Sequence, residues 1–155
     1  NVRMVLLKNL SEKGFVFYTN FNSKKGKELK SNQKASMCFH WKSLRRQVRV
    51  IGQVEEVTTK EADEYYNSRP YKNRISAWAS SQSQVLDNRE TFLKKIKEFK
   101  KKYPDQKKVP RPPYWSGWRL LPDEIEFWVD GEGRIHERLN YKKSKNTWVK
   151  EILYP

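Results

Sequence analysis

Apolar residues, many of them β-branched or aromatic, are concentrated in several short stretches of the chain, and such stretches are typical of β-strands. The pattern is found in residues 15–19, 35–39, 47–54 and 148–153. Residues 2–7 form a continuous apolar run, which is typical of a strand buried on both faces. The pattern therefore predicts a mostly antiparallel sheet whose first strand lies at the start of the chain.

Apolar residues three or four positions apart predict helices between these strands. Ser23 is expected to cap the first helix, and Thr58 with Glu61 forms the capping box of the second. A third helix is predicted over residues 73–79, and Asp87 is expected to open a fourth. The helices are thus inserted at the middle and the side of a sheet.

This order of elements predicts the α+β class: a β-barrel of about seven mostly antiparallel strands with peripheral helices. A chain of 155 residues fits one domain with a proper core. We therefore expect residues 1–155 to form a single domain. Because a core strand is predicted at the very first residues, we also expect a further N-terminal segment to precede them.

Near the C-terminus, a dipeptide of Asp and Gly at 130–131 favours a tight hairpin turn. Alternation along the second strand of that hairpin would place Arg134, His136 and Arg138 on one face, with Trp128 on the facing strand. A row of cations at a solvated sheet edge can simply oppose aggregation. Beside an aromatic ring, it indicates a planar, anionic ligand.

Two further groups of residues suit anions. Lys24 and Lys25 fall in the first turn of the first predicted helix, where cations are unfavourable unless an anion binds. Tyr65 and Arg69 are four residues apart on the second, and a hydroxyl with a guanidinium suits a phosphate. Solvated lysines, and a packed tyrosine beside an exposed arginine, explain the same patterns, so spacing alone leaves both open.

The net charge of +15 indicates a nucleic-acid surface or an anionic metabolite as partner. Residues 94–102 carry a lysine run, although such a run on an amphipathic helix is usually a solvated face. The single Cys38 excludes a disulfide within the chain, which fits a reducing compartment. No apolar run approaches the roughly 20 residues that span a bilayer, so we expect a cytoplasmic protein with no membrane partner.

Several short motifs occur together in one order. They are RMVLLK at 3–8, FYTN at 17–20, SKK at 23–25, RQV at 46–48, SRP at 68–70, AWASSQS at 77–83, WSG at 115–117, EFW at 126–128 and RIHER at 134–138. Each motif alone is weak, but in this order they are specific. Along nearly its whole length, the chain resembles the pyridoxamine 5′-phosphate oxidase family.

The resemblance implies an FMN-binding split barrel that forms a homodimer, with FMN at the subunit interface. It implies an oxidase that converts pyridoxamine 5′-phosphate and pyridoxine 5′-phosphate to pyridoxal 5′-phosphate. Oxygen would accept the electrons and yield hydrogen peroxide, and no nucleic acid would take part. The flavin N5 would accept the hydride, so no protein acid or base is expected.

By motif position, the resemblance also implies two sets of contact residues. The flavin would contact Arg3, Met4, Val5, Leu6, Leu7, Lys8, Tyr18, Thr19, Lys24, Lys25, Gln47, Gln82, Ser83, Trp128 and Arg138. The substrate would contact Lys8, Tyr65, Arg69 and Asn73 through its phosphate, and Arg134, Ile135 and His136 at its ring.

Three positions depart from the family pattern: Asn73 replaces a usual serine, Lys24 a usual arginine and Ser76 a common glycine. An amide can replace a hydroxyl donor, and a lysine keeps the charge but loses the bidentate geometry. Two alternatives stay open. One is a related split-barrel flavin reductase or FMN-binding protein, and the other is a basic nucleic-acid-binding module.

Overall fold

The computed structural model describes residues 1–145 and 147–155, and the chain forms two compact units. The long strand β5 (Trp115–Val129) runs from one unit into the other. The prediction of a single domain stays a prediction. The first unit consists of Asn1–Asn9, Val16–Asn32 and Glu56–Arg119, and the second of Leu10–Phe15, Gln33–Glu55 and Leu120–Pro155.

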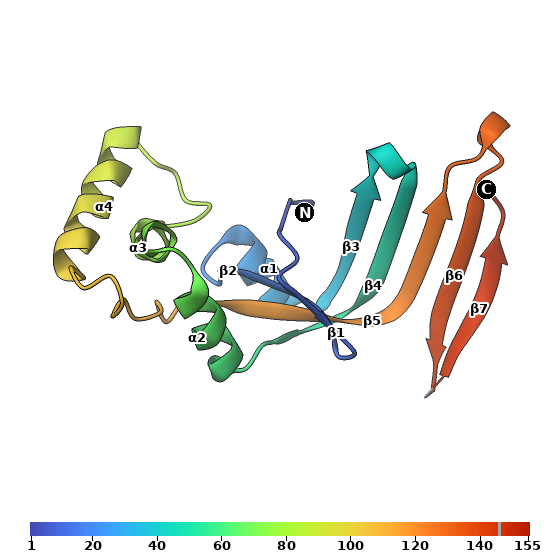
Figure 1. Cartoon of the computed structure of the whole chain (residues 1–155), viewed down its shortest axis with the longest axis horizontal. Coiled ribbons are helices and arrows are strands. Elements are labelled where there is room, and N and C mark those ends of the chain that lie inside the picture. The colour runs from blue at the N-terminus through green and yellow to red at the C-terminus, as the bar shows by residue number, and fades with distance from the viewer. Residues whose placement is uncertain (146) are drawn as a thin grey trace. The chain divides into compact units, whose positions relative to one another are not determined.

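The first unit combines a small part of the sheet with all four helices of the described residues (Figure 1). In it, strand β2 lies beside the first part of β5. No helix of the described chain is long and apolar enough to cross a membrane. The elements are β2 (Gly14–Asn20), α1 (Lys24–Ser31), α2 (Thr59–Ser68), α3 (Tyr71–Ala79) and α4 (Arg89–Lys102).

Two clusters of buried side chains form the core of this unit. Val16 of β2 packs with Val57 and Ala62, and Tyr66 of α2 packs with Ala77 and Trp115. The ring of Tyr18 contacts both clusters. Side chains of β2, α2 and α3 therefore contribute to one core through the ring of Tyr18.

The helix starts follow local capping chemistry. The Ser23 hydroxyl accepts a hydrogen bond from the Gly26 backbone N–H at 3.1 Å, which confirms the predicted cap of α1. At α2, the Thr58 hydroxyl accepts from the Glu61 N–H, and the Glu61 carboxylate accepts from the Thr58 N–H. This reciprocal pair confirms the predicted capping box.

The start of α4 differs by one residue from the prediction. Asn88, not Asp87, is the N-cap, because its side-chain oxygen accepts a hydrogen bond from the Thr91 N–H at 2.9 Å. Asparagine and aspartate are about equally good N-caps, so the sequence alone did not show which of the two neighbouring residues caps the helix.

The second unit is built from strands that lie side by side in the order β3, β4, β5, β6, β7 (Figure 1). The pairs β3–β4, β5–β6 and β6–β7 are antiparallel, as the sequence predicts. Strand β1 (Asn9–Ser11) is a short additional strand of the sheet. The other bounds are β3 (Lys34–Trp41), β4 (Arg46–Glu56), β6 (Glu137–Ser144) and β7 (Thr147–Leu153), with 3-10 turns at Lys42–Leu44 and Glu132–Arg134.

The predicted first strand at residues 2–7 is wrong. Residues 1–8 have no regular secondary structure, and the side chains of Met4 and Leu6 are 100% and 70% exposed. The Lys8 N–H donates to the Val16 carbonyl at 2.8 Å, but no ladder extends from this bond toward residue 1. An apolar run becomes a strand only where a neighbour supplies hydrogen bonds.

The tight turn predicted at residues 130–131 is also wrong. The β5–β6 ladder closes at the pair Val129 and Glu137, so residues 130–136 form a longer loop, called here the hairpin loop. Within it, Gly133 and Arg134 have φ of 62° and 67°. The chain therefore turns at these residues, and Arg134 and His136 do not lie on a strand face with Arg138.

Candidate functional site

A cleft of about 780 Å³ lies in the first unit, within the size range of ligand sites. Its walls come from residues 4–6 and Lys8, β2, the C-terminal end of α2, α3 and the segment after α3. Many of the residues assigned by the resemblance meet here. They are Met4, Val5, Leu6, Lys8, Tyr18, Thr19, Lys25, Tyr65, Arg69, Asn73 and Gln82.

A stack of aromatic rings forms part of the cleft lining. The rings of Tyr18 and Tyr65 lie parallel with centroids 4.0 Å apart, and Tyr18 lies 5.3 Å from Trp115. The Lys8 ammonium lies 5.9 Å from the Tyr65 ring. The Tyr65 ring therefore packs on the core and lines the cleft at the same time, so the two alternatives left open by its spacing are not exclusive.

Arg69 is a half-buried cation at this aromatic surface. Its guanidinium carbon lies 4.7 Å from the Trp115 ring centroid, and its Nη1 is buried with no hydrogen-bond partner among the described residues. Burial lowers the pKa of Arg69 below its ordinary value, because the charged form is poorly solvated. An anion in the cleft would supply the missing partner.

Lys25 is a second half-buried cation in the cleft. Burial, with a smaller contribution from the charge of Arg3, lowers its pKa to about 8. Its ammonium donates to the Thr19 hydroxyl, which donates in turn to the Gln82 side-chain oxygen at 3.1 Å. Residues from α1, β2 and the segment after α3 are thereby connected in one polar chain.

The sequence did not single out Asn20, which organises this corner of the cleft. Its side-chain amide donates to the Ser80 carbonyl at 3.3 Å, and its side-chain oxygen accepts from the Asn22 N–H at 2.8 Å. The Asn20 carbonyl accepts from the Ser23 hydroxyl at 2.6 Å. Asn20 belongs to the FYTN motif, so its place at a strand end before a helix cap was the available signal.

Some residues assigned to the flavin lie outside the lining of the cleft. Arg3 forms an ion pair with Glu28 at 3.4 Å, Leu7 is partly exposed and Lys24 is exposed at the start of α1. Ser83 has φ of 70°, a left-handed conformation that only a constrained turn imposes on a serine. Their role in ligand binding stays a prediction.

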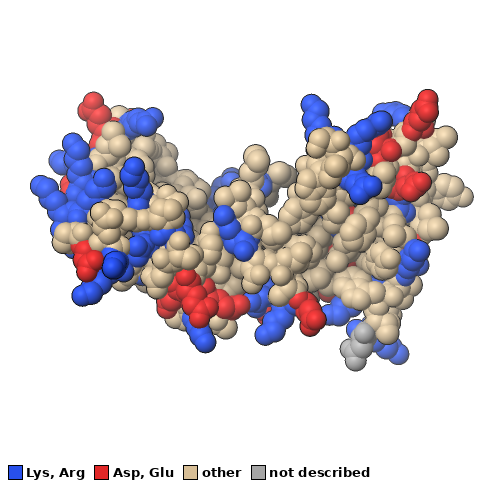
Figure 2. All heavy atoms as spheres, in the orientation of Figure 1, with Lys and Arg blue, Asp and Glu red and all other residues tan. Residues whose placement is uncertain are grey.

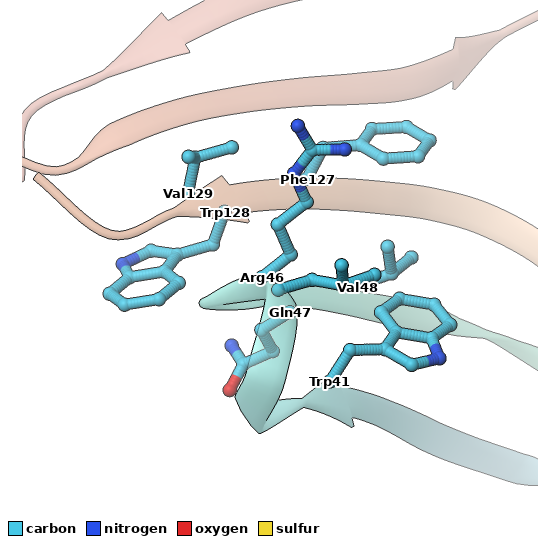
Figure 3. A pocket seen from close by; sticks show the side chains of 8 residues that line it. Trp41, Arg46, Gln47, Val48, Phe127, Trp128 and Val129 are labelled. Carbon is cyan, nitrogen blue, oxygen red and sulfur yellow. The ribbon is translucent and has the colours of Figure 1, made fainter.

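A second, smaller cavity of about 330 Å³ lies in the second unit. Figure 3 shows the side chains of Gln47 and Trp128 on one side of the strands and those of Arg46 and Phe127 toward the other. The period of two along a strand explains this division. Gln47 and Trp128 are the two lining residues that the resemblance assigns to the flavin.

Arg138 lies directly opposite Trp128 in the β5–β6 register. Its Nε and Nη2 donate to the two carboxylate oxygens of Glu126 at 2.9 and 3.2 Å, and its Nη1 donates to the Tyr154 carbonyl at 2.9 Å. Glu126 is only 3% exposed and also pairs with Arg49. The hydrogen bonds that Arg138 donates make the largest contribution to lowering the pKa of the Glu126 carboxyl below its ordinary value.

The hairpin loop holds the remaining three assigned residues. The His136 ring centroid lies 4.7 Å from that of Trp128, so His136 and Trp128 form one surface. Ile135 is 75% exposed, and Arg134 is exposed as well. His136 thus lies beside Trp128, which the resemblance assigns to the flavin. The hairpin loop places it there, and alternation along a strand does not.

The fold defines the class of protein. A solved structure of a pyridoxamine 5′-phosphate oxidase-related, FMN-binding protein from Nostoc punctiforme has a TM-score of 0.76 at 16% identity, covering 99% of this chain and 80% of that one. PhzG from Burkholderia lata, solved with tetrahydrophenazine-1-carboxylic acid, has a TM-score of 0.91 at 31% identity and covers 99% and 74%. The chain has the FMN-binding split-barrel fold, and the predicted fold class is confirmed.

The family follows from the sequence comparisons. The model for pyridoxamine 5′-phosphate oxidase matches residues 1–103, and the one for the pyridoxine 5′-phosphate oxidase C-terminal dimerisation region matches residues 115–155. The chain belongs to the pyridoxamine 5′-phosphate oxidase family of FMN-dependent oxidoreductases.

Two relatives are named pyridoxine/pyridoxamine 5′-phosphate oxidase. The protein of Pelagibacter ubique is 62% identical over 156 residues, which is 100% of this chain and 75% of the relative. That of Brucella canis is 55% identical over 157 residues, covering 100% and 77%. The chain therefore spans about three quarters of the length of these relatives.

Proposed function

We propose that this chain is an FMN-dependent oxidase that converts pyridoxamine 5′-phosphate and pyridoxine 5′-phosphate to pyridoxal 5′-phosphate, with oxygen as the electron acceptor. The supporting comparisons are the family model over residues 1–103 and the 62% identity to the Pelagibacter ubique oxidase. The supporting observation in the structure is the cleft of the first unit, where half-buried cations face a space large enough for a ligand.

Arg69 carries the argument for a phosphorylated substrate. A buried guanidinium nitrogen without a partner is costly, and a phosphate oxygen satisfies it with a charge-assisted hydrogen bond. Tyr65, Lys8 and Asn73 line the same cleft and add a hydroxyl, an ammonium and an amide donor. We assign the substrate phosphate to these four residues.

FMN fits the same donor set, because its phosphate and polar ring edges need cations and amides. When bound, FMN supplies the redox chemistry by accepting a hydride from the substrate. Lys25 and Thr19 would hold its phosphate, and Gln82 would bind a polar group. The protein itself would bind and orient the two ligands and exclude water.

We assign the residues of the second unit to the flavin and the substrate ring. Gln47, Trp128 and Arg138 would contact the flavin, and Arg134 and His136 would orient the substrate ring. The homodimer would be formed through the matched dimerisation region of residues 115–155, with FMN between the subunits. Exposed apolar side chains on its strands, such as Phe127, Trp148 and Ile152, suit a covered interface. The cytoplasmic location stays a prediction.

Steady-state oxidation tests this proposal. The purified protein is loaded with FMN and mixed in air with pyridoxamine 5′-phosphate, and pyridoxal 5′-phosphate and hydrogen peroxide are measured. We expect both products in equal amounts, and little reaction with pyridoxamine, which lacks the phosphate. If the protein bound FMN but oxidised neither phosphorylated vitamer, it would be a split-barrel flavoprotein with another substrate.

A further inference from the structure

Asp130, the first residue of the hairpin loop, contacts His136, near the end of that loop. Its Oδ1 lies 3.1 Å from the His136 Nδ1, and the Gly131 N–H donates a hydrogen bond to the same nitrogen at 3.2 Å. A Cβ at Gly131 would collide with the Ile135 carbonyl oxygen. Glycine at 131 therefore lets the two ends of the loop approach closely enough for this contact.

The contact bears on which imidazole nitrogen carries the proton. One nitrogen of a neutral imidazole is a donor and the other an acceptor. The Gly131 N–H needs an Nδ1 without a proton, whereas the Asp130 carboxylate needs an Nδ1 that carries one. Because a hydrogen bond to a carboxylate is stronger than one between neutral groups, the pair with Asp130 favours the proton on Nδ1. The Nε2 atom is then the nitrogen left for a ligand.

Arg45 holds Asp130 in place from the other side. Its Nε donates to the Asp130 Oδ2 at 2.6 Å, and its carbonyl accepts from the Asp130 backbone N–H at 3.0 Å. Arg45 itself has φ of 51°, a conformation that residues without a special constraint avoid. Both carboxylate oxygens of Asp130 are thus engaged, one by Arg45 and the other by His136.

We propose that Asp130 is a positioning residue that, anchored by Arg45, holds the His136 ring with Nε2 directed to the substrate. The inference rests on the proposed function, in which His136 orients the substrate ring. Asp130 would not touch the substrate. Its carboxylate would act through the tautomer and the orientation of the imidazole, in the way that carboxylates orient histidines in other sites.

The first test is a double-mutant cycle on the FMN-loaded enzyme. Asp130→Ala should lower kcat/KM for pyridoxine 5′-phosphate about tenfold. In a His136→Ala background, the same substitution should have little further effect, because the two residues act as one unit. Asp123→Ala, at an exposed aspartate of β5, is the matched control. Additive losses, or an unchanged kcat/KM in Asp130→Ala, would overturn the inference.

The second test does not depend on activity. The chain has two histidines, so a His40→Gln variant leaves His136 as the single imidazole signal in a nitrogen-15 NMR spectrum. We expect the Nδ1-protonated form in that variant and a shift toward the Nε2-protonated form when Asp130→Ala is added. Asp130→Asn, which keeps the side-chain size, replaces Asp130→Ala if that variant does not fold.

The two tests separate the possible failures. An inactive FMN-loaded protein with the expected histidine spectra would sink the proposed function and leave the Asp130–His136 pairing intact. An active enzyme whose histidine spectrum is the same with and without Asp130 would retain the function and remove the positioning role.

Discussion

The cleft of the first unit and the hairpin end of the second unit differ in whether their cations pair with carboxylates. In the cleft, Arg69 and Lys25 are half-buried and have pKa values lowered by burial. At the hairpin end, Arg138 pairs with Glu126 and Arg45 with Asp130. Among the described residues, no carboxylate pairs with Arg69 or Lys25, which suits an anionic ligand. The cations of the hairpin end are instead held by carboxylates of the same chain.

Among the substitutions that test this difference, Arg69→Met should have the largest effect. It removes the cation and keeps an apolar stem over Trp115, so phosphate binding should be lost with little change in packing. We expect kcat/KM for pyridoxamine 5′-phosphate to fall about a hundredfold, while the slow reaction of unphosphorylated pyridoxamine stays the same. Arg89→Met, at an exposed arginine of α4, is the matched control. An equal loss for both substrates would show that Arg69 does not read the phosphate.

Glu126→Gln tests the hairpin end, where the cations pair with carboxylates. This substitution leaves two arginines facing a neutral amide, so we expect the free energy of unfolding to fall by about 2 kcal/mol. FMN should also bind more weakly, because Arg138 loses its fixed orientation. Urea unfolding and flavin fluorescence measure the two effects. An unchanged FMN affinity would mean that Arg138 does not need Glu126 to bind the flavin.

The pH dependence of stability provides a further check on Glu126. Its pKa in the folded protein lies below the ordinary value of 4.5, so its stabilising contribution is complete above that pH. The contribution is lost as the pH falls through the lowered pKa. The stability difference between the parent protein and Glu126→Gln should therefore narrow in acid, and a constant difference down to the acid transition would contradict the pairing.

A smaller effect is expected from the titration of Lys25 in the cleft. Because burial lowers its pKa to about 8, the charged form that attracts phosphate is lost as the pH rises through that value. The dissociation constant of FMN should rise about tenfold between pH 7 and pH 9. In Lys25→Arg the cation persists at alkaline pH, so the curve should flatten. Identical curves for the two proteins would remove Lys25 from the phosphate site.

The smallest effect is expected from the lysines of α4, which gather on its surface (Figure 2). A triple variant, with Lys94, Lys97 and Lys101 each changed to Gln, should keep kcat/KM within about twofold, because exposed charges are screened. A salt-sensitive affinity of the parent protein for RNA, lost in this variant, would instead support the nucleic-acid alternative.

The sequence predicted the parts of the fold that local chemistry controls. The caps at Ser23 and Thr58 were readable because a side chain and a backbone N–H three residues apart decide them. The apolar run at residues 2–7 was misleading, because a strand depends on a neighbour that the run does not specify. The hairpin loop was misjudged because the positive φ of Gly133 and Arg134 outweighed the turn preference of the Asp-Gly dipeptide.

The family resemblance identified candidate site residues that the composition alone could not identify. Tyr65 and Arg69 could be paired from their helical spacing, but their common cleft with Lys25 and Gln82 depends on tertiary structure. Asn20 and Asp130 were not assigned to the site, because the sequence indicated only a motif position for Asn20 and a turn for Asp130. Their importance lies in contacts with Ser80 and His136, each far away or across a loop.

The most direct test of the oxidase assignment is a single turnover without oxygen. The protein loaded with FMN is mixed anaerobically with pyridoxamine 5′-phosphate, and the flavin absorbance is followed. We expect bleaching of the flavin with one pyridoxal 5′-phosphate formed per FMN, and recovery of the absorbance when air is admitted. A flavin that stays oxidised in the presence of both phosphorylated vitamers would contradict the oxidase assignment.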